Sequence, residues 1–144
     1  MTIEIFIADT DADIEACFTA FKELRPHLLQ TEFLPQVRRQ QLQGYQILAL
    51  RHEGVTKSVA GFRFAEFFAW GKILYIDDLT TMASARSNGF ADKLMDWLVS
   101  HAQEQQCKGL HLDTGYARHD AHRLYLRKKL LLTSHHMSLV ITDD

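Results

Sequence analysis

The sequence is poor in proline, glycine and cysteine, with 2, 7 and 2 of these residues among 144. No stretch rich in serine, glycine or proline is long enough to be a linker, so a two-domain chain and a disordered chain are both disfavoured. The two cysteines, Cys17 and Cys107, lie far apart without a C-x-x-C motif, which argues against a disulfide scaffold and suits a reducing cytoplasm. We therefore predict a single domain over residues 1–144 of a cytoplasmic protein.

Long apolar runs and blocks of like charge are also missing. No segment reaches the ~18 apolar residues of a membrane helix, and acidic residues stand where a signal peptide would carry its basic leader. The net charge is −2, without a basic block for nucleic acid to contact. We expect neither a membrane nor a nucleic acid as partner. Apolar residues make up 47% of the chain and charged residues 24%, as in a globular protein with a real core.

The first half of the chain predicts one strand, two helices and then three strands. Residues 3–7 form the first strand, and Thr10 or Asp11 can cap a helix whose apolar positions recur at helical spacing until Pro26 stops it. A second amphipathic stretch runs up to Gly44, a plausible helix end. The period then changes to that of an antiparallel meander. Its strands are expected at residues 45–51, 58–68 and 72–81.

The second half of the chain alternates helices and strands. Residues 88–106 have the pattern of a long amphipathic helix. A short strand over 110–113, a helix over 118–129 and a last strand over 131–141 follow. Antiparallel strands that precede a strand–helix–strand crossover predict an α+β, or mixed α/β, fold. Its central sheet is mostly antiparallel, with helices on both faces.

The junction after Thr81 has the composition of an anion site. Small and polar residues lead to Gly89, and the first amides of the helix that follows have no partners within the helix. Such amides and the positive end of the helix dipole bind phosphates, and glycine allows close approach of the backbone. Arg86 would add charge, so a diphosphate is the natural ligand. An ordinary strand-to-helix turn explains the same residues, and the junction alone does not decide between the two interpretations.

Three segments together resemble the GNAT superfamily of N-acetyltransferases. Arg86-Ser-Asn-Gly89-Phe-Ala91 fits the pattern R/Q-x-x-G-x-G/A, with Ala91 in place of the more usual second glycine. Residues 110–115 (LHLDTG) and 118–125 (RHDAHRLY) are similar to the LDSG…R-x-x-AHRFY segment of one branch. Residues 76–81 resemble the strand that lies beside the pantetheine arm. The resemblance covers about residues 45–140 of this chain.

The resemblance implies a GNAT-like fold and transfer of an acetyl group from acetyl-CoA to an amine. It implies that the loop over 86–91 holds the pyrophosphate and that the strand end over 79–81 aligns the pantetheine. The residues so assigned to the cofactor are Leu79, Thr80, Thr81, Arg86, Ser87, Asn88, Gly89, Phe90, Ala91 and Arg118. Arg118 stands where many relatives carry asparagine. Lys129-Leu130 stands where the family commonly has Gly-Phe, and a lysine there costs strain if the position needs a positive φ.

The acceptor implied by the resemblance is a small-molecule or peptide amine. N-terminal helices normally shape the acceptor pocket in this family, here with Phe18, Phe21, Glu23, Phe33 and Gln36. Small relatives often pair, so if the chain forms an oligomer, we expect a homodimer. Because no residue looks like an activated nucleophile with its own base, we expect direct transfer between acetyl-CoA and the amine.

Tyr125 is the predicted general acid. The thiolate that departs from acetyl-CoA needs a proton, and a phenol beside the sulfur can supply it. Tyr125 also fits an apolar helix stripe with Ala121 and Leu124, so a packing role is the other interpretation. The resemblance points to the catalytic role.

Two carboxylates interrupt an apolar strand. Alternation sends Asp77 and Asp78 to opposite faces unless a bulge intervenes. Asp78 is favoured for the cleft because Asp77 shares its face with Tyr75 and Leu79. There it would take the ammonium proton through water or anchor a cationic substrate. Glu66 on the neighbouring strand is a weaker alternative.

A non-catalytic function also remains open at this point. An acyl-CoA sensor or interaction module would keep the loop but would not need Tyr125 or a carboxylate in the cleft. A metal site is not expected, because His119 and His122 share a predicted helix without a third ligand at fitting spacing.

Overall fold

The computed structural model describes residues 2–115 and 118–142 and divides the chain into two compact units, Met1–Leu112 and Asp113–Asp144. The first unit contains β1 (Ile3–Ile7), α1 (Asp11–Glu15), α2 (Phe18–Leu24), α3 (Gln30–Gln41), β2 (Gln46–His52), β3 (Val55–Phe67), β4 (Gly71–Thr81), the 3-10 turn η1 (Ala83–Ala85), α4 (Phe90–Glu104) and β5 (Gly109–Leu112). The second unit contains α5 (His119–Arg127). None of the helices within the described ranges is long and apolar enough to span a bilayer.

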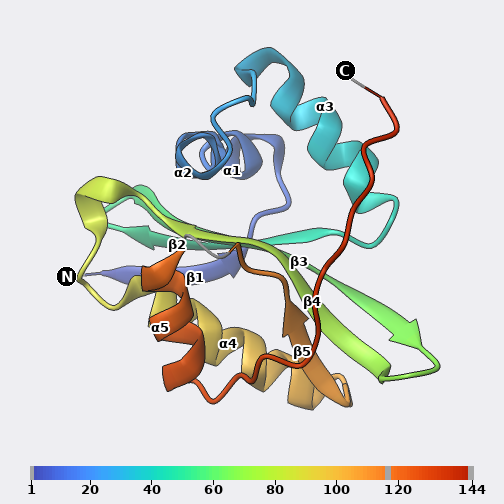
Figure 1. Ribbon diagram of the computed structural model, residues 1–144. Coiled ribbons are helices and arrows are strands. Elements are labelled where there is room, and N and C mark those ends of the chain that lie inside the picture. Colours follow the sequence, from blue (N-terminus) through green and yellow to red (C-terminus); the bar gives the residue numbers. More distant parts are fainter. Residues whose placement is uncertain (1, 116–117, 143–144) are drawn as a thin grey trace. The chain divides into compact units, whose positions relative to one another are not determined.

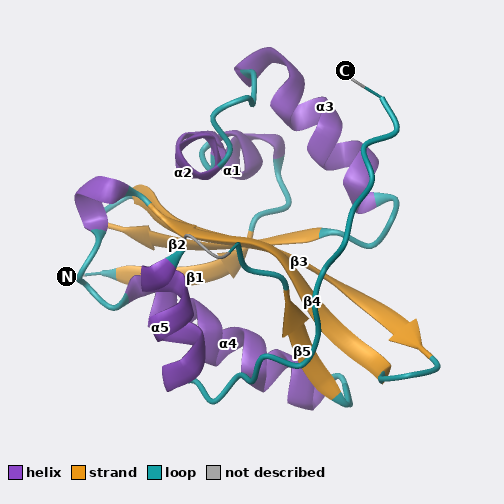
Figure 2. Cartoon of the chain, in the orientation of Figure 1, coloured by secondary structure: helices purple, strands orange, loops and turns teal. Residues whose placement is uncertain are grey.

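The sheet of the first unit has the strand order β1-β2-β3-β4-β5. Strands β1 to β4 pair antiparallel in sequence order, and β5 pairs parallel to β4. Helices α1, α2 and α3 lie on one face of this sheet, and α4 lies on the other (Figures 1 and 2). The predicted mixed fold, with a mostly antiparallel sheet and helices on both faces, is confirmed.

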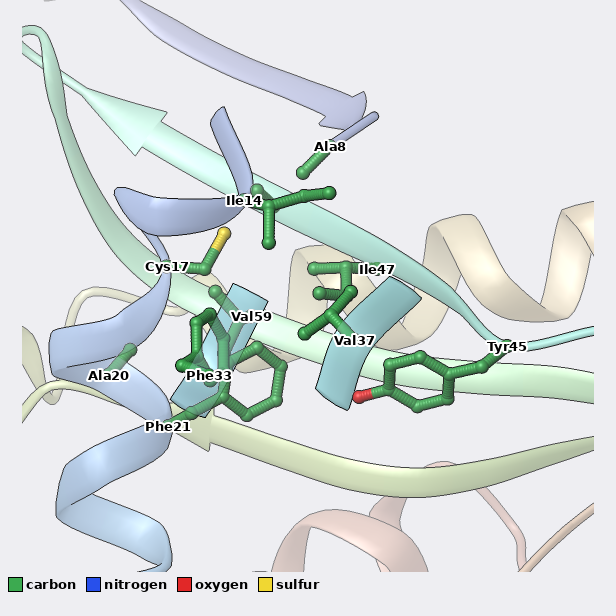
Figure 3. Packing of buried hydrophobic residues seen from close by; sticks show 11 residues of the cluster. Ala8, Ile14, Cys17, Ala20, Phe21, Phe33, Val37, Tyr45, Ile47 and Val59 are labelled. Atoms are coloured by element: carbon green, nitrogen blue, oxygen red, sulfur yellow. The ribbon is translucent and has the colours of Figure 1, made fainter. Parts of the chain in front are cut away.

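Apolar layers fill both faces of the sheet. Figure 3 shows the layer between the N-terminal helices and the sheet, which consists of Ala8, Ile14, Cys17, Ala20, Phe21, Phe33, Val37, Tyr45, Ile47, Ala49 and Val59. On the opposite face, Leu94, Met95 and Leu98 of α4 are fully buried. Phe62 of β3 packs against the Trp97 ring of α4 with 6.3 Å between centroids. The sheet therefore packs against an apolar core on each face, and this packing holds its strands, β4 included, in position.

The helix expected to run up to Pro26 is two helices in the structure. Thr10 Oγ1 accepts a hydrogen bond from the Asp13 amide at 3.1 Å, so the predicted cap is confirmed. The Cys17 amide then bonds to the Ile14 carbonyl, three residues back, at 3.0 Å. A bond of this kind tightens the turn and ends the helix, so α2 begins as a separate element.

The hairpin between β2 and β3 is tighter than predicted. Glu53 and Gly54 both have positive φ, 54° and 80°, as a type I′ turn requires. His52 pairs directly with Val55 across this turn. Strand β3 therefore begins at Val55 and not at Ser58.

The prediction of a last strand over residues 131–141 is wrong. Among the described residues, none after β5 belongs to a strand. The apolar residues of this segment suit an extended chain, but a strand also needs a neighbour to accept its backbone hydrogen bonds. Periodicity along one segment cannot report whether that neighbour exists.

Helix α5 ends in a Schellman motif. The Lys129 amide bonds to the Leu126 carbonyl and the Leu130 amide bonds to the Tyr125 carbonyl, both at 3.0 Å. Lys129 has a φ of 69°. The strain expected for a lysine in place of glycine is therefore present at this position.

Candidate active site

A bulge in β4 places two carboxylates where this strand leaves β5. Gly61 of β3 pairs with Asp78, and Phe62 pairs with Ile76, so Asp77 is an extra residue in the ladder. An extra residue breaks the strict alternation of side chains along a strand. The rule that would send Asp77 and Asp78 to opposite faces therefore does not hold here.

Asp77 is engaged by a neighbouring arginine. Arg63 Nε donates to Asp77 Oδ1 at 3.0 Å, and Nη2 donates to Oδ2. Burial raises the pKa of Asp77, while the hydrogen bond and charge of Arg63 oppose this shift. Both oxygens of Asp77 thus belong to a two-point ion pair within the sheet.

The Asp78 carboxylate accepts hydrogen bonds from two residues that are distant from it in the sequence. Arg25, directly after α2, donates to Asp78 Oδ1 from Nε at 3.1 Å and from Nη2 at 2.9 Å. The Tyr45 hydroxyl, directly before β2, donates to Asp78 Oδ2 at 3.2 Å. Burial raises the pKa of Tyr45 well above its ordinary value, and the negative charges of Asp78 and Asp77 raise it further by smaller amounts. The phenol therefore stays protonated and remains a donor.

Tyr45 and Arg25 are functional candidates that the sequence did not reveal. Tyr45 has the character of a core aromatic, and it is only 4% exposed. Arg25 lies 53 positions from its carboxylate partner. Helical or strand periodicity relates residues a few positions apart, so no pattern in this one sequence joins these side chains to Asp78.

Asp78 lines a cavity of about 150 Å³. Its lining consists of Phe21, Arg25, His27, Leu28, Phe33, Gln36, Val37, Gln40, Tyr45 and Asp78. Three of the five helix residues expected to shape the acceptor pocket are among them: Phe21, Phe33 and Gln36. Of the other two, Phe18 packs against the Phe33 ring, and Glu23 accepts a hydrogen bond from the Ala83 amide at 2.8 Å.

The end of β4 has an open edge next to this cavity. Strand β5 pairs only with Ile73–Ile76, so Leu79, Thr80 and Thr81 have β3 as their only strand partner in the part of the chain that the structure describes. Ser58 of β3 donates to the Thr80 carbonyl at 3.0 Å and lies 2.8 Å from Thr81 Oγ1. An open strand edge offers backbone groups to an extended ligand with amide groups, such as pantetheine.

The loop after η1 has the backbone of an anion-binding nest. Ser87 and Gly89 have φ of 70° and 75°, and backbone turns of this kind turn successive amides toward a common ligand. The amides of residues 87–91 donate to no acceptor that the structure describes. Helix α4 begins at Phe90, so the positive end of its dipole lies at the same amides.

The loop is anchored without using these amides. Asn88 Nδ2 donates to the Ala85 carbonyl at 2.8 Å, and Arg86 Nε donates to the Thr81 carbonyl at 3.4 Å. A Cβ added to Gly89 would meet no protein atom within 4 Å. Protein packing therefore does not demand a glycine there, whereas its positive φ and a ligand close to the backbone both do. The pyrophosphate of acetyl-CoA fits this donor set.

Two predicted site residues lie in the second unit. Arg118 is exposed and directly precedes α5. Tyr125 lies within α5 and is 7% exposed. Burial raises the pKa of Tyr125, and the charge of Arg118 opposes the shift. The phenol is protonated at neutral pH, which is the form that a general acid needs. Its buried ring also suits the packing interpretation, so its role stays a prediction.

The first unit therefore combines a loop with the backbone of an anion-binding nest, an open strand edge and a small polar cavity. These features are typical of an enzyme that binds a phosphate-bearing cofactor beside a pocket for a small acceptor. Comparisons with known proteins identify the class of this enzyme.

The model of the acetyltransferase (GNAT) family matches residues 10–130. YhdJ, an uncharacterized N-acetyltransferase of Bacillus subtilis (strain 168), is 29% identical over 112 residues, which are 77% of this chain and 79% of that protein. Among solved structures, the aminoglycoside N-acetyltransferase AAC(6')-Iy in complex with CoA has a TM-score of 0.85 at 13% identity, over 96% of this chain and 94% of that one. Glucosamine-6-phosphate N-acetyltransferase from Arabidopsis thaliana has a TM-score of 0.79 at 17% identity, over 99% and 100% of the two chains.

The chain belongs to the acetyltransferase (GNAT) family. It is an acetyl-CoA-dependent acetyltransferase, and its acceptor is an amine. The resemblance noted in the sequence is thus confirmed at the level of family, fold and reaction. The roles of individual residues stay predictions.

Proposed function

We propose that this enzyme acetylates a small amine by direct transfer, with the acceptor in the cavity at Asp78. The observation that carries this proposal is the position of Asp78. It lines the cavity and directly precedes the open edge of β4 at Leu79–Thr81. An acceptor in the cavity would thus lie beside the residues proposed to align the cofactor, and positioning of two reactants contributes much of the rate in such reactions.

In the first unit, both backbone groups and one side chain would bind the cofactor. The amides of residues 87–91 would hold the pyrophosphate, and the exposed Arg86 would add a positive charge. The backbone of Leu79–Thr81 would pair with the pantetheine arm. Arg118 of the second unit is proposed as a further cofactor contact. When bound, acetyl-CoA supplies the activated acetyl thioester.

Tyr125 and Asp78 are the proposed catalytic residues. Tyr125 would donate a proton to the departing thiolate, and its raised pKa keeps that proton in place at neutral pH. Asp78 would attract the acceptor ammonium and take its proton through water. Arg25 donates twice to Asp78 Oδ1 and Tyr45 donates once to Oδ2, which leaves Oδ2 with capacity for another donor.

A panel of amines tests the proposal. The purified full chain is expected to bind acetyl-CoA in calorimetry and to release free thiol only when an accepted amine is present. Thiol release with no amine dependence would contradict direct transfer. Binding of acetyl-CoA without turnover on any amine would support the non-catalytic acyl-CoA sensor instead.

A homodimer is part of the proposal, and the C-terminal segment supports it. Six large apolar side chains there are 76–90% exposed: Leu131, Leu132, Met137, Leu139, Val140 and Ile141. Large exposed apolar patches usually mark interaction sites, and a second copy brings the same segment, so one two-fold contact covers both. Light scattering at micromolar concentration should give twice the chain mass, and the double variant Met137→Ser/Leu139→Ser should be monomeric. A monomeric mass for the unmodified chain would reject the dimer.

The proposed setting is the cytoplasm, with a small-molecule or peptide amine as acceptor and no nucleic-acid partner. Acetyl-CoA is made and used inside cells, and both Cys17 and Cys107 are free thiols. The net charge of −2 gives nucleic acid no electrostatic attraction.

A further inference from the structure

We propose that the acceptor is a small amine that also carries a carboxylate, and that Arg25 is the residue that binds this carboxylate. This inference rests on the proposed function, because it places the acceptor in the cavity at Asp78. It goes further by naming the chemical class of the acceptor and a specificity-determining residue. Three features of the cavity support it: the hydrogen bonds of Arg25, the charge balance and the size.

Asp78 orients the guanidinium of Arg25 through Nε and Nη2, and Nη1 is available to a ligand. Nε and Nη2 donate to Asp78 Oδ1, and Nη2 also reaches the Asp77 carbonyl at 3.4 Å. Nη1 makes no hydrogen bond with a described residue, although Arg25 lines the cavity. A guanidinium presents its donors in a rigid fork that matches a carboxylate. Asp78 therefore holds Arg25 in place, with donors left for a ligand.

Charges around the cavity favour an acceptor with both signs. Arg63 balances Asp77 in a two-point pair, and Arg25 balances Asp78 across 2.9 Å. An acceptor with only an ammonium group would add positive charge beside Arg25. An amino acid adds no net charge, since its carboxylate meets Arg25 and its ammonium meets Asp78. Neither ion pair has to be broken, because Nη1 of Arg25 and the remaining lone pair of Asp78 Oδ2 serve the ligand.

The size and remaining lining suit a small amino acid. A cavity of about 150 Å³ has room for a group on the order of six to ten non-hydrogen atoms. Phe21, Phe33 and Val37 are buried and provide an apolar wall for a short aliphatic side chain. At the polar side, Gln36 Nε2 donates to Gln40 Oε1 at 2.9 Å, which leaves Gln36 Oε1 and Gln40 Nε2 for the ligand.

The test compares three amines that carry the same isopropyl group next to the carbon bearing the nitrogen: L-valine, L-valinamide and isobutylamine, which lacks the carboxyl carbon. The expected kcat/KM for L-valine exceeds that for each other amine by at least about tenfold, because only its carboxylate gains charge-assisted hydrogen bonds from the guanidinium. L-Valinamide is less basic and offers more neutral amine at pH 8, so chemical reactivity alone would favour it. O-Phosphoethanolamine, compared with ethanolamine, shows whether a phosphate replaces the carboxylate.

Variants assign the effect to Arg25. Arg25→Gln should raise the KM for L-valine about tenfold or more with a similar kcat, since a contact made equally before and during the reaction affects binding only. For isobutylamine, which has no carboxylate, the same variant should lower kcat/KM by at least about tenfold less than it does for L-valine. Arg38→Gln is the matched control, because Arg38 is 39% exposed beside the 45% of Arg25 and pairs with Asp11 outside the cavity. Arg38→Gln should leave KM and kcat unchanged for both L-valine and isobutylamine.

Calorimetry with L-valine in the presence of CoA separates the two proposals. Turnover on isobutylamine with no preference for L-valine would overturn the carboxylate proposal and leave the proposed function standing. No turnover on any amine would overturn the proposed function. In that case, binding of L-valine that is lost in Arg25→Gln would still support the carboxylate site, and equal or absent binding in both proteins would reject it. A preference for O-phosphoethanolamine over L-valine would also reject it.

Discussion

The Tyr45 hydroxyl occupies the space that a side chain on Gly61 would fill. A Cβ built on Gly61 would overlap the hydroxyl and the adjoining ring atoms of Tyr45. Gly61 pairs across the sheet with Asp78, and this close approach brings the hydroxyl within 3.2 Å of Asp78 Oδ2. Figure 3 shows the Tyr45 ring at one end of the apolar cluster under the N-terminal helices. Gly61 has no positive φ, so its backbone conformation does not demand glycine. Glycine is required there because a side chain would displace the Tyr45 hydroxyl from the Asp78 carboxylate.

Gly61→Ala should displace the Tyr45 ring and destabilise the protein by about 1–3 kcal/mol, the usual cost of overpacking a core. Gly115→Ala is the matched control, because a Cβ there meets nothing within 4 Å and its φ is not in the left-handed region. Urea unfolding measures both variants. Adding Tyr45→Ala to Gly61→Ala should cost less than the sum of the two single changes, since the clash is then gone. Full additivity would contradict the contact.

Tyr45→Phe should change how stability depends on pH. The raised pKa of Tyr45 means that the folded state holds the phenol proton more tightly than the unfolded state. The stability from this shift is complete below the ordinary tyrosine pKa of about 10 and is lost as the pH rises toward the higher folded pKa. Near pH 7 the variant should lose about 0.5–1.5 kcal/mol for the missing hydrogen bond. Chemical unfolding from pH 7 to 11 should show this difference shrink, and a constant difference would argue against the shift.

Gly89→Ala should weaken cofactor binding at a modest cost in stability. Gly89 and Gly54 have φ of 75° and 80°, and a Cβ on either meets no protein atom within 4 Å. Alanine should therefore cost both positions about 1–2 kcal/mol of left-handed strain. Calorimetry with acetyl-CoA should show at least about tenfold weaker binding for Gly89→Ala only. Equal affinity of the two variants would remove the pyrophosphate from this loop.

Tyr125→Phe tests the proposed general acid. The ring stays in place and only the proton donor is lost, so folding and acetyl-CoA affinity should barely change. Turnover should fall by roughly 10²–10⁴-fold, the usual contribution of a positioned acid. Tyr125→Ala should in addition destabilise the protein by about 3–5 kcal/mol, because truncation of a buried aromatic leaves a cavity. Unchanged turnover in Tyr125→Phe would leave Tyr125 with a packing role only.

Lys129→Gly should stabilise the protein. Lys129 has a φ of 69° at the end of α5, and a residue with a Cβ costs about 1–2 kcal/mol in that region. Glycine removes this strain but gains freedom in the unfolded chain, so a net gain of about 0.5–1 kcal/mol is expected. Lys128 is the control, since its φ of −85° is ordinary and glycine there should destabilise. Thermal melts of both variants check the opposite signs.

The local features of this enzyme could be predicted from its sequence. The cap at Thr10 depends on a side chain and an amide three residues away. The loop at Gly89 depends on one backbone conformation and the start of α4. The amphipathic pattern of α4 depends on a period of 3.6 residues. Each feature involves neighbours along the chain, so its cause is written in a short stretch of sequence.

Only the tertiary structure decided what surrounds Asp78. Its partners Arg25 and Tyr45 lie 53 and 33 positions away, and the bulge at Asp77 depends on the register against β3. The missing strand over residues 131–141 has the same origin, since a strand depends on its partner as much as on its own pattern. Register, bulges and ion pairs across the fold arise from long-range packing, in which many residues compete for the same space. The residues of one segment therefore determine its helix, turn or cap, whereas the acceptor cavity exists only once the sheet and helices have come together.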